Sequence, residues 1–435
     1  VHQTAGLPAR LASRPGQHVP HGSITTPRPM PCIFRATTMR MPQLPQRRSN
    51  QRRQHIPQRS NELTAAWFTN VLATGSAVSH VRLENIGADV GFMGEVHRCH
   101  LTWDSAHGDS DLPTSVIVKM PTQVDENFAV GDGMQAYERE IVVYQRLRPS
   151  LGLPMPKFFY GAMDPDPAPW LGRPLFFLFE HLPIRSVNWL IGQFLKLSAK
   201  SKRRYILVLE DIDDARAPTQ LTGGTLDDAH QALVVLAAFH AHNWMRTEPQ
   251  ETYDKIWPMD RASRVFQASY LRNRDAFVER FGHVVSGDTV AHLDEIQDRV
   301  PDISASLAAR PWTLLHGDFR LDNLLFRPDG EIVVLDLQGL GMGRPAVDVA
   351  YFITTALTSE HRDEEELLLR TYHDALVGAG VSSYSWVQLV SDCHLAKELL
   401  AHRIVGSADV LDTSVSGDSD DLLDVMQLRV LDWLT

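Results

Sequence analysis

The feature that most constrains this chain is the spacing of three polar residues, Asp318, Asn323 and Asp336. Asn323 follows Asp318 by five positions, and Asp336 ends the apolar run at residues 332–335. The Asp-to-Asn spacing alone is typical of a turn that precedes a strand. Because His-Gly stands before it at residues 316–317 and Asp336 follows, the pattern instead indicates a catalytic loop with two metal ligands behind it.

These residue types suit the transfer of a phosphoryl group. Such a transfer needs little covalent chemistry, because catalysis comes mainly from positioning and from neutralising the charge that develops on the γ-phosphate. We predict that Asp318 accepts the proton of an incoming hydroxyl group. Asn323 and Asp336 would supply hard oxygen ligands to Mg²⁺, against the β- and γ-phosphates of ATP.

The same segment resembles the aminoglycoside phosphotransferase and choline kinase superfamily, in particular its ecdysteroid-kinase-like branch. Residues 316–318 are similar to that group's catalytic loop, and residues 336–348 to its metal-binding segment. The resemblance covers roughly residues 76–405, and its upstream motifs lie at 116–119, 138–141, 207–211 and 236–241. It implies an α+β, protein-kinase-like fold of two lobes, a small, mainly antiparallel β lobe and a larger helical lobe.

Three parts are expected along the chain. Residues 1–60 form a disordered tail rich in Arg and Pro, and residues 61–211 form an ATP-binding lobe with an insertion at about 170–204. Residues 212–435 form the helical lobe, which carries the catalytic and acceptor sites.

Two alternating runs, residues 81–86 and 95–101, predict a pair of antiparallel strands. The turn between them carries Gly91 and Gly94, where missing side chains would let backbone N–H groups approach the phosphates of ATP. The spacing does not match a Gly-x-Gly-x-x-Gly loop, so a plain hairpin remains an equal alternative.

Lys119 follows the apolar strand predicted at residues 115–118, and Glu140 lies 21 residues downstream on a predicted helix. A lysine at the end of a strand is usually a solvated charge. A Lys–Glu pair would instead orient the ammonium group toward the α- and β-phosphates. Glu138 is the competing carboxylate, and we prefer Glu140 because the family pattern places it just before the Ile-x-x-Tyr face of the helix.

The chain departs from the family between Asp164 and Leu207, where the connection between two predicted strands is much longer than in its relatives. Two segments, 175–180 and 205–210, are candidates for the strand that joins the lobes. We choose the second, because Glu210 and Asp211 match the family's hinge, whose backbone could bind adenine. The insertion is expected to pack on the small lobe or to be an intron read as protein, and a membrane-surface helix is the alternative.

The C-terminal part is expected to be helical. Thr225 opens a capping-box pattern, and the patterned segments 349–353, 363–377, 384–405 and 419–434 predict further helices around the acceptor pocket. We interpret His240 and His316 as structural residues and Asp348 as an anchor of the catalytic loop.

Charge separates the N-terminal tract from the rest. Residues 1–60 contain ten Arg, no acidic residue and nine prolines, without apolar periodicity, which predicts disorder. The prolines argue against a targeting helix, and the chain begins at Val1, so we favour a disordered tail or translated upstream sequence over a targeting segment or an RNA-binding arm. The remaining 32 basic and 53 acidic residues give a net charge of −21, which argues against nucleic acid as a partner.

Cysteine usage and hydropathy bear on location. Cys32, Cys99 and Cys393 are widely spaced and fit neither a disulfide framework nor a metal motif, which favours a cytoplasmic location. No apolar run reaches the ~18 residues of a membrane span, so we predict no transmembrane segment.

The combined expectation is an ATP- and Mg²⁺-dependent phosphotransferase that acts on a hydroxyl group of a small molecule. A catalytically silent kinase-like binding protein would usually have lost Lys119, Asp318, Asn323 or Asp336, and none is lost. A protein kinase is disfavoured, because only eleven residues separate Asp336 from Asp348 and leave no room for a long activation segment. The acceptor and the oligomeric state stay open.

Overall fold

The structure, a computed structural model, describes residues 55–86, 93–104, 112–201, 203–246, 255–406 and 419–433. Of the tail expected at residues 1–60, residues 1–54 lie outside the described residues. The turn expected to carry Gly91 also lies outside them, from residue 87 to residue 92. No helix in the described part of the chain is long and apolar enough to span a membrane.

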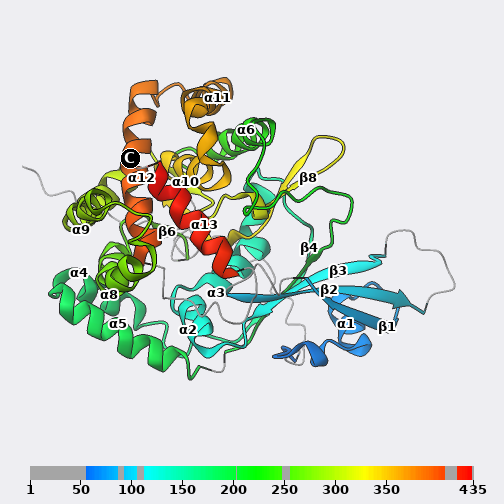
Figure 1. The fold of residues 1–435 in the computed structure, drawn as a ribbon. Coiled ribbons are helices and arrows are strands. Elements are labelled where there is room, and N and C mark those ends of the chain that lie inside the picture. The colour runs from blue at the N-terminus through cyan, green and yellow to red at the C-terminus, as the bar shows by residue number, and fades with distance from the viewer. Residues whose placement is uncertain are drawn as a thin grey trace, which may run out of the picture. The chain divides into compact units, whose positions relative to one another are not determined.

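The smaller lobe is built on a five-stranded sheet in the order β1-β2-β3-β5-β4 (Figure 1). Its strands are β1 (Val78–Asn85), β2 (Gly94–Trp103), β3 (Ser115–Pro121), β4 (Phe158–Met163) and β5 (Tyr205–Glu210). Every neighbouring pair runs antiparallel, so the predicted pairing of the first two strands is confirmed. The helices between these strands, and the one before them, are α1 (Ala65–Leu72), α2 (Asp125–Gly133), α3 (Ala136–Val142), α4 (Gly172–His181) and α5 (Ile184–Ser198).

Side chains that alternate along the sheet build two cores on its two faces. On one face Val118 and Val208 pack with Phe68 of α1. On the other face Leu207 packs in the cluster that contains Ile141 of α3. Because β5 is buried on both sides, its sequence is a continuous apolar run rather than an alternating one.

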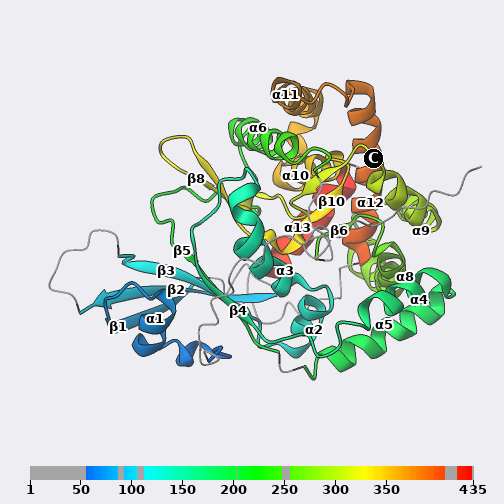
Figure 2. The ribbon, with the colours of Figure 1, turned by 180° about the vertical axis from the view of Figure 1, so that it is seen from behind.

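The segment 205–210 is the strand that pairs with both β3 and β4, so the preferred candidate for the lobe-joining strand is confirmed. The competing segment, 175–180, lies in helix α4. The expectation that the insertion packs on the small lobe is only half right. Helix α5 contacts α2 and also α8 (Ser263–Phe281) of the helical lobe, and both views show α4 and α5 beside α8 (Figures 1 and 2).

The larger lobe is mainly helical, so the expected α+β architecture with a small antiparallel β lobe is confirmed. Its helices are α6 (Leu226–His242), α8, α9 (Gly287–Ala308), α10 (Ala346–Ala356), α11 (Glu365–Gly378), α12 (Trp386–Gly406) and α13 (Ser419–Asp432). Thr225 closes the predicted capping box with Asp228 at the start of α6.

Five short strands position the loops between these helices. They are β6 (Trp257–Pro258), β7 (Thr313–Leu315), β8 (Leu324–Phe326), β9 (Ile332–Val334) and β10 (Gly341–Gly343). Strands β6, β10 and β7 form one small sheet, and β8 and β9 form a hairpin. The predicted catalytic loop therefore runs from β7 to β8, and Asp336 follows β9.

Candidate active site

Lys119 forms the ion pair that the sequence predicts. Its Nζ donates a hydrogen bond to Oε1 of Glu140 across 2.6 Å, from β3 to α3. The Glu140 carboxylate is almost fully buried, and Gln338 Nε2 donates to its second oxygen at 3.3 Å. The ammonium group is therefore fixed in direction rather than free in solvent.

The competing carboxylate, Glu138, has other partners. It pairs with Arg203 at 3.3 Å and with Lys255 at 2.9 Å. Because the two acids stand two positions apart on one helix, at roughly 100° of rotation per residue, their side chains point in nearly opposite directions. The pairing of Lys119 with Glu140 rather than Glu138 is confirmed.

Lys119 also reaches across to the other lobe, where its Nζ lies 3.5 Å from Oδ1 of Asp336. Burial alone would lower the pKa of Lys119, but Asp336 and Glu140 outweigh burial and raise that pKa to about 12. Burial would in turn raise the pKa of Asp336, and the Lys119 charge overcomes this and holds it below its usual value. The pair is therefore ionised near neutral pH.

A second link between the lobes lies beside this pair. Arg139, the residue before Glu140, donates to the backbone oxygen of Gln338 at 2.5 Å and to that of Lys255 at 2.7 Å. Burial lowers the pKa of Arg139 to about 10, which leaves it charged at neutral pH. Helix α3 is thus tied directly to the segment that carries Asp336.

The backbone of the catalytic loop is held by helix α10, as predicted for Asp348. The two carboxylate oxygens of Asp348 accept the backbone N–H groups of His316, at 2.6 Å, and of Gly317, at 2.9 Å. His240 lies 3.2 Å from the same carboxylate and 2.8 Å from the Tyr372 hydroxyl, so its structural interpretation is also confirmed. Asp348 is buried, and these contacts satisfy its charge.

Gly317 is required at its position for two reasons. Its φ of 81° lies in the left-handed region, and a Cβ atom there would stand 2.1 Å from the backbone oxygen of Gly339. The His316 ring also links the loop to the segment before Asp336. Its Nε2 lies 2.9 Å from the Leu335 oxygen, and its Nδ1 accepts a hydrogen bond from the Asp318 N–H at 3.2 Å. The catalytic loop and the Asp336 segment are therefore packed backbone to backbone.

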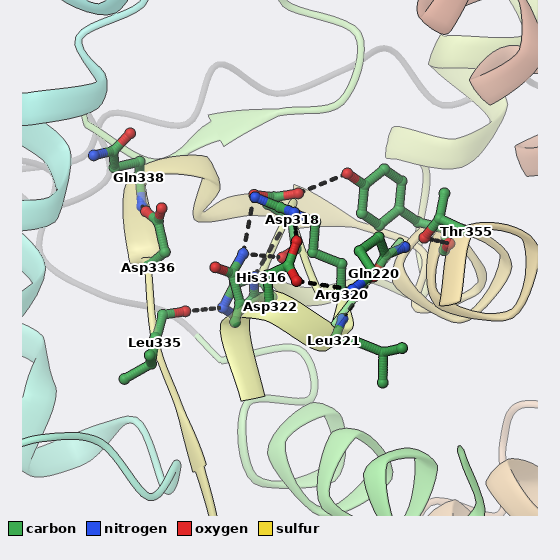
Figure 3. A network of polar contacts seen from close by, with 12 residues as sticks. Gln220, His316, Asp318, Arg320, Leu321, Asp322, Leu335, Asp336, Gln338 and Thr355 are labelled. Carbon is green, nitrogen blue, oxygen red and sulfur yellow. Dashed lines mark hydrogen bonds and ion pairs between the residues drawn. The ribbon is translucent and has the colours of Figure 1, made fainter. Parts of the chain in front are cut away.

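The carboxylate of Asp318 is held at both oxygens (Figure 3). The Tyr351 hydroxyl donates to Oδ1 at 2.6 Å, and Asn323 Nδ2 donates to Oδ2 at 3.0 Å. Arg320 Nε donates to the same Oδ2 at 3.3 Å and also binds Asp322. Although burial opposes the charge of Arg320, Asp318 raises the pKa of the guanidinium, which therefore stays charged.

Asn323 and Asp336 lie at matching ends of the β8–β9 hairpin. Leu324 pairs with Val334, and Leu335 N–H donates to the Asn323 backbone oxygen at 2.8 Å. Asp336 then turns with a φ of 60°, which Asp tolerates because its carboxylate accepts a local hydrogen bond from Gln338 N–H at 3.3 Å. The hairpin thus brings the predicted amide and carboxylate ligands together.

These two residues fit a magnesium ion that is shared with phosphate oxygens. The Asn323 amide uses its NH₂ group on Asp318, and its side-chain oxygen accepts no hydrogen bond from the described residues. Within the described ranges, no group of three or more His, Cys, Asp or Glu side chains could hold a metal alone. An ion with one amide and one carboxylate ligand would take its remaining ligands from phosphate and water, which is the usual manner of Mg²⁺.

The remaining predicted nucleotide contacts lie apart from this cluster. Gly94 begins β2, and a Cβ atom there would lie 3.1 Å from the Met120 oxygen. Glu210 ends β5, where its N–H donates to the Lys157 oxygen at 2.9 Å, and the Asp211 carboxylate accepts from Arg98 Nε at 2.8 Å. Since the Glu210 N–H is already bonded, an adenine contact there would use backbone carbonyls or the Asp211 N–H.

Three residues of the site were assigned no role from the sequence. Arg320 and Gln338 lie within the motifs around Asp318 and Asp336, so their place in these motifs is the sequence signal that could have identified them. Tyr351 lies 33 residues after Asp318, on a helix whose apolar pattern predicts only contacts with the core. No sequence signal identifies it as part of the site. Burial raises the pKa of Tyr351 well above its usual value, and Asp318 adds to the effect, so the hydroxyl remains a donor.

Comparisons with solved structures find distant similarity. Spectinomycin phosphotransferase, solved with ADP and spectinomycin, is 11% identical with a TM-score of 0.46, covering 87% of this chain and 94% of its own. Choline kinase from Cryptosporidium parvum is 10% identical, with a TM-score of 0.44 and coverage of 82% and 88%. Macrolide 2'-phosphotransferase type I is 13% identical, with a TM-score of 0.44 and coverage of 83% and 98%.

No curated protein sequence matches this chain. The family assignment rests instead on a sequence model of the ecdysteroid kinase-like family, which matches residues 90–380. That range holds Lys119, Glu140, Asp318, Asn323 and Asp336, the five residues that the fold gathers from β3, α3, the catalytic loop and the end of β9. Since the match spans more than half of the sequence, this chain belongs to the ecdysteroid kinase-like family.

Proposed function

We propose that the protein is an ATP-dependent phosphotransferase that moves the γ-phosphate to a hydroxyl group of a small molecule. One observation carries the proposal. Lys119 touches Glu140 and Asp336 together, so a partly buried, oriented cation lies next to a carboxylate suited to Mg²⁺. This is the arrangement that phosphoryl transfer requires at the nucleotide phosphates.

The residues of the site then take distinct roles. Lys119, oriented by Glu140, binds phosphate oxygens of the nucleotide. Asn323 and Asp336 hold Mg²⁺, which neutralises charge on the phosphates when it is bound. Asp318 orients the acceptor hydroxyl and takes its proton, while Arg320 and Asn323 hold the direction of its carboxylate.

The length of the segment after Asp336 favours a small acceptor over a protein. In the structure, residues 337–343 form one short helical turn and β10, and α10 begins at Ala346. A peptide-docking activation segment has no place between them. Helix α10 instead brings Tyr351 directly to Asp318.

The experiment is a phosphate-transfer screen of the purified chain with Mg·ATP. The panel would contain sterol-like alcohols, amino alcohols, sugars and antibiotics, and Asp318→Asn would be the matched control. We expect the chain to transfer radiolabelled phosphate to at least one hydroxyl compound and the variant to lose that transfer. If the chain binds Mg·ATP tightly but neither transfers phosphate to any compound nor hydrolyses ATP, the result would support a catalytically silent binding protein instead.

A further inference from the structure

The inserted helices α4 and α5 expose several large apolar side chains. Trp170, just before α4, is 72% exposed and Phe177 is 59% exposed, while in α5 Trp189 is 64% and Leu197 is 68% exposed. A single exposed apolar residue is ordinary on a protein surface. Two exposed tryptophans with Phe177 and Leu197 in one helical hairpin indicate a surface made to contact something.

The outward side of this hairpin differs from the side that packs. Phe179, Val187 and Ile191 are buried against Ala268 of α8. The exposed residues of α5 are 185, 186, 189, 193, 196 and 197, which recur every three to four residues, and the exposed Lys200 lies in the turn just after the helix. They therefore share one face of the helix, opposite the packed face.

This outward face is positively charged. The sequence has no Asp or Glu from His181 to Leu209, and Arg185, Lys196 and Lys200 are exposed. Among the described residues, none of the three forms an ion pair. Glu180, at the end of α4, is the single acidic residue of the hairpin.

Two arginines at the end of the insertion, Arg203 and Arg204, are neutralised, unlike Arg185, Lys196 and Lys200. Arg203 pairs with Asp132 and Glu138, and Arg204 pairs with Asp164. The fold therefore uses these two arginines to fasten the end of the insertion. Arg185, Lys196 and Lys200 remain available to an external anionic partner.

We propose that the outward faces of α4 and α5 dock on an anionic lipid surface. Exposed Trp and Phe beside Lys and Arg is the composition of helices that lie in the plane of a membrane interface. The aromatic rings would enter the headgroup region, and the long basic side chains would reach the lipid phosphates. A second copy of this chain fits less well, because a two-fold contact would bring this basic face against the same basic face of the other copy.

The test is sedimentation of the full chain with vesicles, without nucleotide, so that it does not depend on kinase activity. We expect the chain to bind phosphatidylcholine vesicles that contain about 30% phosphatidylserine, and to bind pure phosphatidylcholine weakly. The triple variant Arg185→Gln, Lys196→Gln, Lys200→Gln should bind the anionic vesicles more weakly. We expect the binding constant to fall roughly fivefold for each positive charge removed. Trp189→Ala should weaken binding to both kinds of vesicle, since it removes apolar contact rather than charge.

Matched controls come from exposed residues outside the hairpin. Arg82→Gln on β1, where the side chain is 62% exposed, and Val387→Ala on α12, where the residue is 76% exposed, should leave vesicle binding unchanged. All variants should keep the thermal midpoint of the parent chain, because each altered side chain faces solvent. Absence of binding to anionic vesicles would overturn the proposal, as would unchanged binding by the triple variant. A dimer in sedimentation equilibrium that Trp189→Ala dissociates, with no vesicle binding, would assign the surface to self-association instead.

Discussion

The Tyr351 hydroxyl donates a hydrogen bond of 2.6 Å to Oδ1 of Asp318. Tyr351 lies on α10, one helical turn after Asp348, which holds the backbone of the same loop. One helix therefore fixes both the path of the catalytic loop and the direction of its carboxylate.

Tyr351→Phe should act through the orientation of Asp318. We expect kcat to fall about tenfold with little change in KM for ATP, because a donor to the carboxylate is lost and the nucleotide contacts remain. Steady-state kinetics with varied ATP would separate the two parameters, and an unchanged kcat, or equal effects on kcat and KM, would contradict this positioning role.

Asp318→Asn should remove the proton acceptor while keeping the shape of the side chain. We expect kcat to fall by orders of magnitude and the affinity for ATP to stay within a few-fold, because the role is realised in the transition state. Asp275→Asn is the control, since that side chain is 95% exposed and lies outside the site. Near-normal turnover of Asp318→Asn would contradict the assignment.

Asp336→Ala should abolish the Mg²⁺ dependence of nucleotide binding. The carboxylate is the one negatively charged ligand of the proposed pair, and Asn323 supplies only a neutral oxygen. Titration calorimetry with ATP in the presence and absence of Mg²⁺ measures the effect directly. Unchanged Mg·ATP binding by this variant would place the metal elsewhere.

Glu140→Gln and Glu138→Gln should have different effects, although the two residues share a helix. Glu140 orients Lys119, so we expect the first variant to lower kcat/KM for ATP by about ten- to a hundredfold. Glu138 joins Arg203 and Lys255, so the second variant should lower the thermal midpoint and leave KM for ATP nearly unchanged. Kinetics and thermal melts on both variants would settle the roles, and equal losses of kcat/KM would contradict them.

His402 should make the helical lobe sensitive to acid. Burial lowers the pKa of this histidine to about 3, with a further contribution from Arg403, whereas an unfolded histidine titrates near its ordinary value of 6.5. Between these two values the unfolded chain binds more protons, so the free energy of unfolding should fall as pH decreases from 6.5 toward 3. The slope from this residue should approach about 1.4 kcal/mol per pH unit.

Denaturant unfolding at pH 7, 6 and 5 would check the effect against His402→Gln. The variant loses the contact of Nε2 with Gln297 and so should be less stable at pH 7. Its stability should nevertheless decline less steeply with acid than that of the parent chain. Parallel declines would show that other groups control the acid response.

Several features of the fold and the site could be predicted from the sequence, because they depend on residues that are close along the chain. The spacing from Asp318 to Asn323 and on to Asp336 is the length of one loop and one hairpin, so local geometry brings the side chains together. The strands around residues 81–86 and 95–101 follow from alternation, and the start of α6 follows from its capping box. The pairing of Lys119 with Glu140 was predicted from family spacing and is present.

The tertiary structure decided what periodicity left open. The apolar run at 175–179 suits a strand or a buried helix equally by its composition, and packing on α8 makes it a helix. The resemblance already favours 205–210 as the lobe-joining strand, and the packing on both faces of the sheet accounts for its continuous apolar run. Tyr351 reached Asp318 only because Asp348 docks α10 on the catalytic loop. Spacing along the chain thus determined the chemistry of the site, while contacts between distant segments, which depend on how whole helices pack, determined what orients it.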